Sequence, residues 1–488
     1  MSGPAAWFRR EGLALLTDFY ELTMMAGQWR EGRMDRRVSF DYFFRALPPH
    51  TGFAVSAGLG LFLDYLENLR FDDSDLDYLR SLGVFDDDFL AYLRDFTPQC
   101  TVRAVPEGSL VFPFEPAVQV EASILEAQLL ETALLNFMNY STLIATKAAR
   151  VCLAAEGEPV MEFGLRRAHG PDGGVTGSRA AHIGGCTSTS NVLAGKAYGV
   201  PVSGTHAHSW VMSFPTELEA FRAFARQYPE RCVLLVDTYD TIKSGVPNAI
   251  RVFQEMRERG MNVRPAIRLD SGDLAKLSKL AHKMMAGAGF DDPLIIASND
   301  LDEDLIADLK RQGAKINGWG VGTHLITAFD CPALGGVYKL TAIQSGNEWQ
   351  ARMKLSSNAE KATDPGRKQM LRCFDAEDRP LGDIISLEEH PPHRTRGTLA
   401  GRLQKNPHLP AHIEGVARVG TMLRPVFADG RRTAAPEPVD RLRARAQAEL
   451  AALPEEYKRL RNPEIYRVLL SEELGRMKDR MMTHPELA

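Results

Sequence analysis

Short apolar runs alternate with amphipathic segments through the centre of the chain, and this is its strongest structural pattern. Six apolar runs have the length of a strand, at residues 159–164, 200–205, 232–238, 264–270, 294–299 and 318–323. Apolar residues recur at helical spacing between them, at residues 217–227, 249–259, 274–286 and 302–312. Continuous apolar strands that alternate with helices predict a parallel sheet covered on both faces, either doubly wound or closed into a barrel. Six units favour the barrel.

The region before this alternation has a mixed pattern. Helical spacing at residues 13–29 gives way to an aromatic and β-branched run at residues 38–44 that is typical of a strand. Short helices are expected at residues 61–69, 76–82 and 89–96, and strands within residues 101–120. The apolar region at residues 124–153 contains Glu126, Glu131, Lys147 and Arg150, so it predicts a buried or interfacial helix and no membrane span.

The pattern changes again after residue 334. Antiparallel strands are expected at residues 336–344, 350–355 and 369–374, linkers at 388–396 and 429–438, and charged helices at 441–452 and 455–482. We therefore expect an α/β protein with an irregular (β/α) barrel of parallel strands, plus an α+β domain built from the N-terminal region and the segment after the barrel. The expected boundaries are 1–145, completed by 346–430, for the α+β domain, 146–345 for the barrel, and 431–488 for a C-terminal helical extension.

Composition and charge narrow the classes of function. The chain has 488 residues, of which 44% are hydrophobic and 25% charged, as in ordinary soluble proteins. Its 58 Lys and Arg residues against 63 Asp and Glu give a net charge of −5, which argues against a nucleic acid partner. The six cysteines form no C-x-x-C pair, and residues 1–10 lack the apolar run of a signal peptide. Free thiols, a cytoplasmic location and no membrane partner are expected.

Polar residues close every one of the six predicted strands. In parallel α/β folds ligands bind outside the carboxyl ends of the strands, so these residues are candidates for a site. A single polar strand end is as often a helix cap, but six that converge favour a site. The residues are Glu162, Thr205, Asp237, Arg268 with Asp270, Ser298, and Thr323.

The residue types at these ends suit a phosphorylated substrate. Gly322 and Thr323 offer backbone N–H groups and a hydroxyl to a phosphate. Arg166 and Arg268 offer forked donors to phosphate or carboxylate, although either is equally well explained as half of a structural ion pair.

Carboxylates and histidines add further candidate chemistry. Asp237, Asp270 and Asp273 are suited to Mg²⁺, which prefers a few carboxylates together with substrate phosphates. Two histidines, His206 and His208, follow Gly204-Thr205, and an imidazole there can move protons or accept a phosphoryl group. The alternative is a turn whose histidines only cap a helix.

Several motifs together resemble the nicotinate phosphoribosyltransferase family, which belongs to the type II phosphoribosyltransferases. The resemblance covers about residues 16 to 355, and the segments that carry it occur in family order. They are Leu-Thr-Asp-Phe-Tyr-Glu-Leu-Thr-Met at 16–24, Glu-Phe-Gly-Leu-Arg-Arg at 162–167, Gly-Thr-x-x-His-Ser at 204–209, Ile-Arg-Leu-Asp-Ser-Gly-Asp at 267–273, Ser-Asn at 298–299, Gly-x-Gly-Thr at 320–323 and Gly-Val-Tyr-Lys-Leu at 336–340. No Walker sequence occurs, so any ATP is expected to bind in another way.

The resemblance implies that nicotinate attacks C1 of phosphoribosyl pyrophosphate, giving nicotinate mononucleotide and pyrophosphate for NAD biosynthesis. It also implies Mg²⁺ as cofactor and ATP as co-substrate, with ATP hydrolysis coupled through a phosphohistidine at His208. His206 stands where the family usually carries an apolar residue, and it is a candidate proton partner for His208.

The resemblance further assigns roles to site residues. His208 and Asp270 are implied to be catalytic, and Asp237 and Asp270 to hold Mg²⁺. Phe163 is implied to stack on the pyridine ring, and Tyr20 of a neighbouring subunit to cover its other face, so a homodimer with shared sites is expected. The implied substrate-binding residues are Tyr20, Phe163, Arg166, Thr205, Ser209, Asp237, Arg268, Ser298, Gly322 and Thr323.

Two alternatives stay open at this point. The first is a phosphoribosyltransferase of the same superfamily that uses nicotinamide or quinolinate as the base. The second is a barrel without catalytic activity that binds a phosphorylated metabolite.

Overall fold

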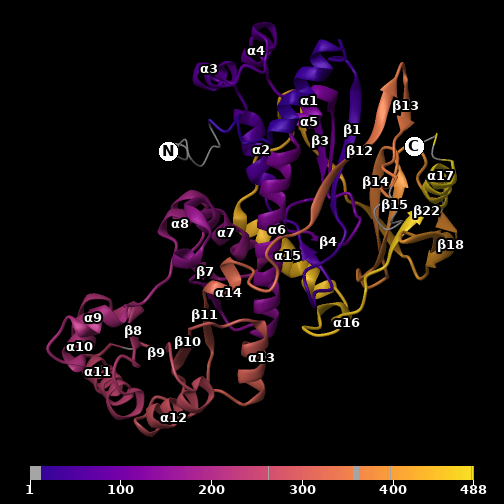
Figure 1. Ribbon diagram of the computed structural model, residues 1–488. Coiled ribbons are helices and arrows are strands. Elements are labelled where there is room, and N and C mark those ends of the chain that lie inside the picture. Colours follow the sequence, from indigo (N-terminus) through magenta and orange to yellow (C-terminus); the bar gives the residue numbers. More distant parts are fainter. Residues whose placement is uncertain are drawn as a thin grey trace. The chain divides into compact units, whose positions relative to one another are not determined.

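The computed structural model describes residues 12–261, 263–355, 362–392, 394–395, 397–484 and 486 (Figure 1). Its contacts divide the chain into two compact units. The barrel unit is Ile144–Pro332, and the antiparallel unit combines Met1–Leu143 with Ala333–Ala488. The three-part domain boundaries expected above stay a prediction.

The barrel unit is built on six parallel strands. They are β6 (Val160–Glu162), β7 (Ser188–Thr189), β8 (Val233–Leu235), β9 (Ala266–Leu269), β10 (Leu294–Ala297) and β11 (Gly318–Val321). Their spatial order is β7-β6-β11-β10-β9-β8, so β6, the first of these six strands in the sequence, pairs with β11, the last of them. Such pairing is what closes a parallel barrel, and the predicted α/β fold is confirmed.

Amphipathic helices lie outside these strands, as Figure 1 shows. The helices are α10 (Glu217–Gln227), α11 (Val246–Glu258), α12 (Leu274–Gly287) and α13 (Glu303–Arg311). Three of the four, all except α11, begin where a polar side chain caps the first turn. For example, the Asp273 carboxylate accepts from the Lys276 backbone N–H at 2.9 Å, and Asp302 accepts from Leu305 at 2.8 Å. Asp273 is thus a helix cap.

The second predicted strand, at residues 200–205, is wrong. The sheet contains β7 at that place, and within residues 200–205 only Val202 forms a bridge, to Thr189. Pro201 has no N–H to donate to a ladder, and Gly199 has a left-handed φ of 76° that turns the chain just before it. The extended segment therefore continues toward the site without forming a ladder.

The barrel unit also contains helices that the sequence does not predict, among them α7 (Gly170–Gly184) and α8 (Val192–Tyr198). The first is rich in glycine, a residue that normally weakens helices. Its last glycine lies against the long helix α6 (Glu131–Ala154), where a Cβ atom on Gly184 would come within 2.2 Å of the Ala145 carbonyl oxygen. Close helix packing, which single-residue propensity does not report, explains this glycine.

The antiparallel unit contains a sheet in the order β13-β12-β1-β5-β3-β20-β21. Its strands are β1 (Arg37–Phe44), β3 (Thr101–Ala104), β5 (Val118–Ser123), β12 (Gly336–Ser345), β13 (Glu348–Ala351), β20 (Arg424–Ala428) and β21 (Arg431–Arg432), and the short pair β2 (Ala54–Val55) and β4 (Leu110–Val111) lies apart from it. Because β21 occupies part of residues 429–438, that segment is not only a linker. The linker predicted at 388–396 lies partly outside the described residues.

The N-terminal helices follow the predicted pattern with shifted ends. They are α1 (Phe19–Arg30), α2 (Leu59–Asn68), α3 (Asp73–Ser81), α4 (Asp87–Arg94) and α5 (Ile124–Leu129). The first begins at residue 19 and not at 13, and the long apolar region is divided into α5 and α6 at Leu130.

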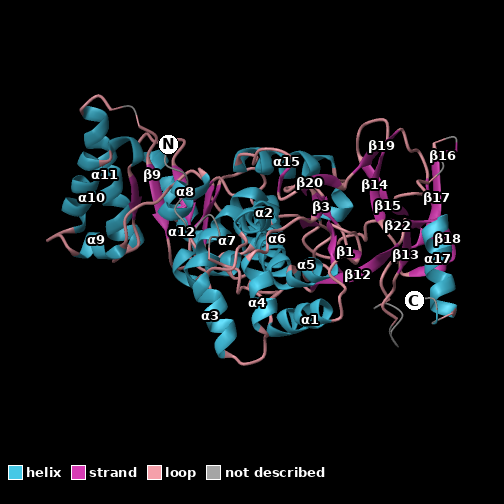
Figure 2. Cartoon of the chain, turned by 90° about the horizontal axis from the view of Figure 1, so that it is seen from above, coloured by secondary structure: helices cyan, strands magenta, loops and turns pink. Residues whose placement is uncertain are grey.

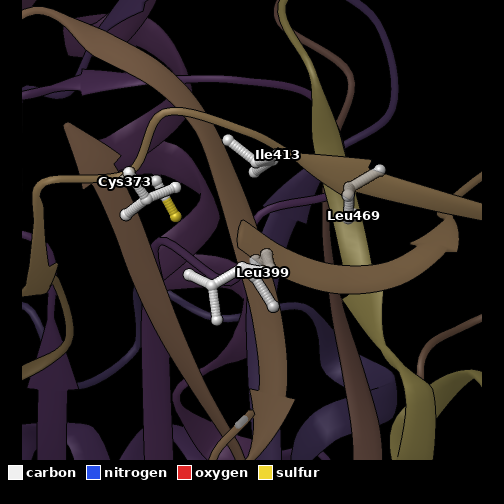
Figure 3. Close-up of a cluster of buried hydrophobic side chains, with 6 residues drawn as sticks. Cys373, Leu399, Ile413 and Leu469 are labelled. Atoms are coloured by element: carbon white, nitrogen blue, oxygen red, sulfur yellow. The ribbon is translucent and has the colours of Figure 1, made fainter. Parts of the chain in front are cut away.

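A second sheet of the antiparallel unit has the order β16-β17-β22-β15-β14-β19, with β18 paired to β17. Buried Cys373, Leu399, Ile413 and Leu469 pack together on it (Figure 3). The strands are β14 (Lys368–Phe374), β15 (Pro380–Leu387), β16 (Arg394–Thr395), β17 (Thr398–Leu403), β18 (Asn406–Ile413), β19 (Arg418–Thr421) and β22 (Val468–Ser471).

The C-terminal segment is not the continuous helix predicted for residues 455–482. It forms α15 (Val439–Ala452), α16 (Glu455–Lys458), strand β22 and α17 (Glu472–Thr483). The apolar residues of β22 pair with β15 and β17 and are buried, so tertiary pairing overrides the helical pattern. Figure 2 shows α17 beside β18, with which it is in contact.

Within the described residues no helix is long and apolar enough to cross a membrane. The six cysteines, which all lie in the described part of the chain, form no disulfide, as expected.

Candidate active site

Three neighbouring strands of the barrel unit end in a row of hydrogen-bonded side chains. After β8, Asp237 Oδ2 accepts from the Asp270 backbone N–H at 2.8 Å and from the Ser271 hydroxyl at 2.6 Å. After β10, the Ser298 hydroxyl donates to Asp270 Oδ1. The structure therefore brings together Asp237, Asp270 and Ser298, as the polar strand ends predicted.

Arg268, on β9, has N–H donors that no described residue accepts. Its Nη1 donates to Thr205 Oγ1 at 2.5 Å, while its Nε is buried without a hydrogen-bond partner among the described residues. Burial lowers the pKa of Arg268, and the nearby charge of Arg166 lowers it further, against the opposing effect of Asp270 and Asp237. A guanidinium in this state is suited to receive an anion.

His208 opens the short helix α9 (His208–Met212) and contacts two other strand ends. Its Nδ1 lies 3.2 Å from Thr238 Oγ1, and its Nε2 lies 3.6 Å from Asp270 Oδ2. The side chain is 41% exposed, so a ligand can reach the ring. Thr238 was not among the predicted site residues, although its position directly after Asp237 at a strand end was a signal for it.

His206 has a different environment from His208. Its Nε2 accepts a hydrogen bond from the Leu235 backbone N–H at 3.2 Å, and its Nδ1 lies 3.4 Å from the Ala207 carbonyl oxygen. The ring is 7% exposed, and burial lowers its pKa to about 4. Because both ring nitrogens face backbone groups, the role of proton partner to His208 is not supported.

Phe163 follows β6 and packs against β11. Its backbone N–H donates to the Val321 carbonyl at 2.8 Å, and a Cβ atom on Gly320 would lie 2.7 Å from the Phe163 ring. Glycine at position 320 therefore leaves the space that the ring occupies. Gly322 then precedes the short helix α14 (Thr323–Ile326), which places Thr323 at its first position.

Glu162, the polar residue that ends β6, has a structural role. Its carboxylate is fully buried and accepts from the Ser178 hydroxyl at 2.8 Å and from the Thr189 hydroxyl at 2.6 Å. The Gly164 backbone N–H also donates to it. These bonds hold β6, β7 and α7 together, and they leave little of this carboxylate for a ligand.

The remaining predicted residues are not joined to this network by hydrogen bonds in the described part of the chain. Arg166 and Ser209 are exposed, at the end of β6 and in α9. Tyr20 belongs to α1 of the antiparallel unit and is 47% exposed. Burial and the acidic neighbours Glu131 and Glu21 raise the pKa of Tyr20 to about 12. The roles that the resemblance gives these residues stay predictions.

The residues expected to hold Mg²⁺ offer a limited donor set. No group of three or more His, Cys, Asp or Glu side chains arranged for a metal occurs in the described residues. Asp237 Oδ1, however, is buried and has no hydrogen-bond partner in the part of the chain that the structure describes. One free carboxylate oxygen fits Mg²⁺, because this ion commonly takes one or two carboxylates and completes its shell with water and substrate phosphates.

The fold and this site define a class, the parallel α/β barrel with a cluster of charged and polar side chains at its strand ends. Models of three parts of the nicotinate phosphoribosyltransferase (NAPRTase) family match residues 15–139 (N-terminal domain), 159–380 (family) and 367–478 (C-terminal domain). The chain belongs to the nicotinate phosphoribosyltransferase family, and the resemblance noted in the sequence is confirmed.

Individual relatives agree with this assignment. The chain is 45% identical to nicotinate phosphoribosyltransferase of Bacillus subtilis, over 96% of this chain and 94% of that protein. It is 38% identical to the Homo sapiens protein of the same name, over 94% and 95%. The crystal structure of human nicotinic acid phosphoribosyltransferase superposes with a TM-score of 0.84 at 35% identity, covering 95% of this chain and 99% of that one.

Proposed function

We propose that this chain transfers the phosphoribosyl group of phosphoribosyl pyrophosphate to nicotinate, forming nicotinate mononucleotide and pyrophosphate in NAD biosynthesis. Membership of the family supports the reaction. The single observation that carries it is Arg268, a guanidinium with unused donors beside the carboxylates of Asp237 and Asp270. Such a group is suited to a substrate that carries a diphosphate.

The main contribution of the protein to this reaction is electrostatic stabilisation of the charges that develop in the transition state. As the bond between C1 and the diphosphate oxygen breaks, the ribose becomes oxocarbenium-like and the diphosphate takes up the electron pair. The pyridine nitrogen of nicotinate then forms the new bond to C1. Arg268 stabilises the charge that develops on the leaving diphosphate, and its partial burial strengthens that interaction.

The carboxylates have distinct tasks in this proposal. Asp237, through the Oδ1 that no described residue contacts by a hydrogen bond, and Asp270 would hold Mg²⁺. When bound, this ion supplies further charge neutralisation at the diphosphate. Ser298 and the Asp270 backbone N–H keep the two carboxylates in place.

The other site residues bind the substrates. Phe163 stacks on the pyridine ring, and Tyr20 of the partner subunit covers its other face, so the active form is a homodimer. Thr205 and Arg268 hold nicotinate, while Gly322 and Thr323 hold the 5-phosphate. Arg166, Ser209 and Ser298 complete the substrate-binding set.

ATP hydrolysis is coupled to this reaction through His208. With Nδ1–H donating to Thr238 Oγ1, the Nε2 lone pair is free to attack the γ-phosphorus of ATP. The bond to the β-phosphate oxygen breaks, ADP leaves, and water later cleaves the phosphorus–nitrogen bond. The exposure of the ring and its position beside Asp270 support this role.

The test is an assay of pyrophosphate release with Mg²⁺, phosphoribosyl pyrophosphate and each of three bases, with and without ATP. Release with nicotinate, together with a higher turnover or lower KM when ATP is present, is expected. Activity only with nicotinamide or quinolinate would overturn the choice of base. Binding of phosphoribosyl pyrophosphate without turnover of any base would indicate a barrel that only binds a metabolite.

The coupling mechanism has its own test, incubation with γ-labelled ATP. An acid-labile label is expected on the wild-type protein and on His206→Ala, and no label on His208→Ala. The opposite pattern in the two variants would contradict the assignment of His208.

A further inference from the structure

No hydrogen-bonded ladder joins β7 to β8 in the described chain, and we call this edge of the barrel the seam. Strands β7 and β8 are the two ends of the sheet order, and the extended segment around Val202 lies next to β7. The Thr189 N–H donates to the Pro201 carbonyl at 2.9 Å, and the Ser203 N–H donates to the Thr189 carbonyl at 3.0 Å. This segment thus pairs on one side only.

A side chain takes the place of the missing ladder on the other side. The backbone N–H of Leu235, on β8, donates to Nε2 of His206 at 3.2 Å. Successive backbone N–H groups of a strand point to opposite edges, and that of Val236 donates to the Arg268 carbonyl of β9. The Leu235 N–H therefore points to the open edge, where the imidazole accepts it.

The surroundings of His206 leave little freedom to its ring. Phe224 of α10 meets it edge to face, with ring centroids 4.8 Å apart, and Phe221 lies 6.0 Å away. Nε2 is the acceptor, so the proton is on Nδ1, directed at the Ala207 carbonyl. Without the imidazole, the Leu235 N–H would lie in an apolar seam with no acceptor, which is costly for a buried donor.

Thr205, directly before His206 in the chain, and His208, two residues after it, both belong to the site. Thr205 accepts from Arg268 Nη1, and its hydroxyl lies 3.2 Å from the His206 carbonyl oxygen. His208 reaches Thr238 and Asp270 from the start of α9. The hydrogen bond between His206 and Leu235 thus fixes the chain between Thr205 and His208. These two side chains must be held to within a fraction of an ångström to act together.

We propose that His206 is a positioning residue: its ring replaces the missing strand pairing of β8 and thereby holds Thr205 on Arg268 and His208 on Thr238. The proposal rests on the proposed function for its kinetic consequences. Its structural part concerns the seam alone and can be tested without turnover.

Three variants separate positioning from simple packing. His206→Leu keeps a similar volume and removes the acceptor, whereas His206→Gln keeps an amide oxygen within reach of the Leu235 N–H. Phe224→Leu is the matched control, because it removes an aromatic contact with the ring and leaves the hydrogen bond in place.

Hydrogen exchange followed by mass spectrometry measures directly how well the backbone N–H of Leu235 is protected at the seam. The peptide that contains Leu235 is expected to exchange faster in His206→Leu than in the Phe224→Leu control, and at the wild-type rate in His206→Gln. Equal exchange in His206→Leu and the wild type would overturn the proposal whatever the enzyme's activity.

Steady-state kinetics and labelling by ATP measure how the loss of this hydrogen bond affects the site. His206→Leu is expected to raise KM for nicotinate and to lower labelling by γ-labelled ATP, each by about tenfold, and His206→Gln to restore both to within about threefold. The Phe224→Leu variant should keep the wild-type values even if its melting temperature falls.

Two results would contradict the positioning role. One is an equal kinetic loss in Phe224→Leu and His206→Leu, and the other is a folded His206→Gln variant without rescue. A wild-type protein that forms no nicotinate mononucleotide would instead refute the proposed function, and the exchange experiment would still decide the seam.

Discussion

Two arginines, one in each unit, differ in how their hydrogen bonds are used: Arg372 is buried, and Arg268 is partly buried. Arg372, on β14 of the antiparallel unit, has a side chain that is 4% exposed. Its Nη2 donates to Asp383 at 2.8 Å and to the Leu110 carbonyl at 2.9 Å, and its Nη1 donates to Glu449 at 3.0 Å. Burial alone would lower the pKa of Arg372, but its acidic neighbours, Asp383 first, raise it well above the ordinary value.

Arg268 in the barrel unit has the opposite balance. Its only hydrogen-bond partner in the described chain is a neutral hydroxyl, that of Thr205, and its pKa is lowered by burial. The carboxylates of Asp237 and Asp270 are close enough to affect its charge without bonding to it. A cation whose donors are all satisfied within the fold stabilises that fold, whereas a cation with donors left over is available to a substrate.

The largest effect on stability is expected at Arg372. Replacement by Met leaves Asp383 buried without its cation, which lowers the free energy of unfolding by about 3–5 kcal/mol. Urea denaturation of the variant measures this change. The control is Arg379→Met, which breaks an ion pair whose arginine is 58% exposed and should cost at most about 1 kcal/mol. Equal losses in the two variants would remove the distinction.

The next largest effect is expected on catalysis, at Arg268. Arg268→Met should lower kcat/KM by about 10²–10³, because it removes a preorganised donor to the leaving diphosphate. The free energy of unfolding should change by less than about 1 kcal/mol, since this guanidinium has few internal partners. If Arg268→Met instead loses as much stability as Arg372→Met and its folded fraction has normal activity, then Arg268 stabilises the fold, as Arg372 does, and does not act on the substrate.

A third, smaller effect concerns pH and the buried imidazole of His206. Its pKa of about 4 in the folded protein lies below the ordinary value near 6.5, so the unfolded chain binds more protons between these two values. His206 therefore contributes stability that is present above pH 6.5 and is lost as pH falls toward 4, by at most about 3 kcal/mol. In His206→Leu the difference in unfolding free energy between pH 7 and pH 4.5 should shrink. An unchanged difference would show that other groups cause the pH dependence.

The smallest effect is expected at Gly320, beside the Phe163 ring. An added Cβ atom would lie 2.7 Å from the ring, so Gly320→Ala must displace it and should raise KM for nicotinate about tenfold. Gly287→Ala is the control, because nothing lies within 4 Å of its Cβ position. Steady-state kinetics of both variants would show whether the position of Phe163 matters, and equal KM values would argue that it does not.

The sequence predicted the barrel unit well because its strands are continuous apolar runs that end in polar residues. Asp237, Arg268, Asp270 and Ser298 lie together because parallel strands bring their carboxyl ends to one edge. Thr238 could have been included on the same argument.

Other features depend on tertiary contacts that local patterns do not encode. The glycine-rich α7 forms because Gly184 permits close packing on α6, and β22 forms because two strands are available to pair with it. The hydrogen bond of His206 is to the backbone N–H of Leu235, which is distant in sequence. Whether an arginine is satisfied within the fold, as Arg372 is, can be decided only once its partners are known.

Calorimetric binding of phosphoribosyl pyrophosphate in the presence of Mg²⁺ measures whether the free donors of Arg268 receive the anionic substrate. We expect Arg268→Met to bind this ligand about 100-fold more weakly than the wild type, while its melting temperature stays close to the wild-type value. Wild-type affinity in a folded Arg268→Met protein would show that Arg268 does not bind the substrate.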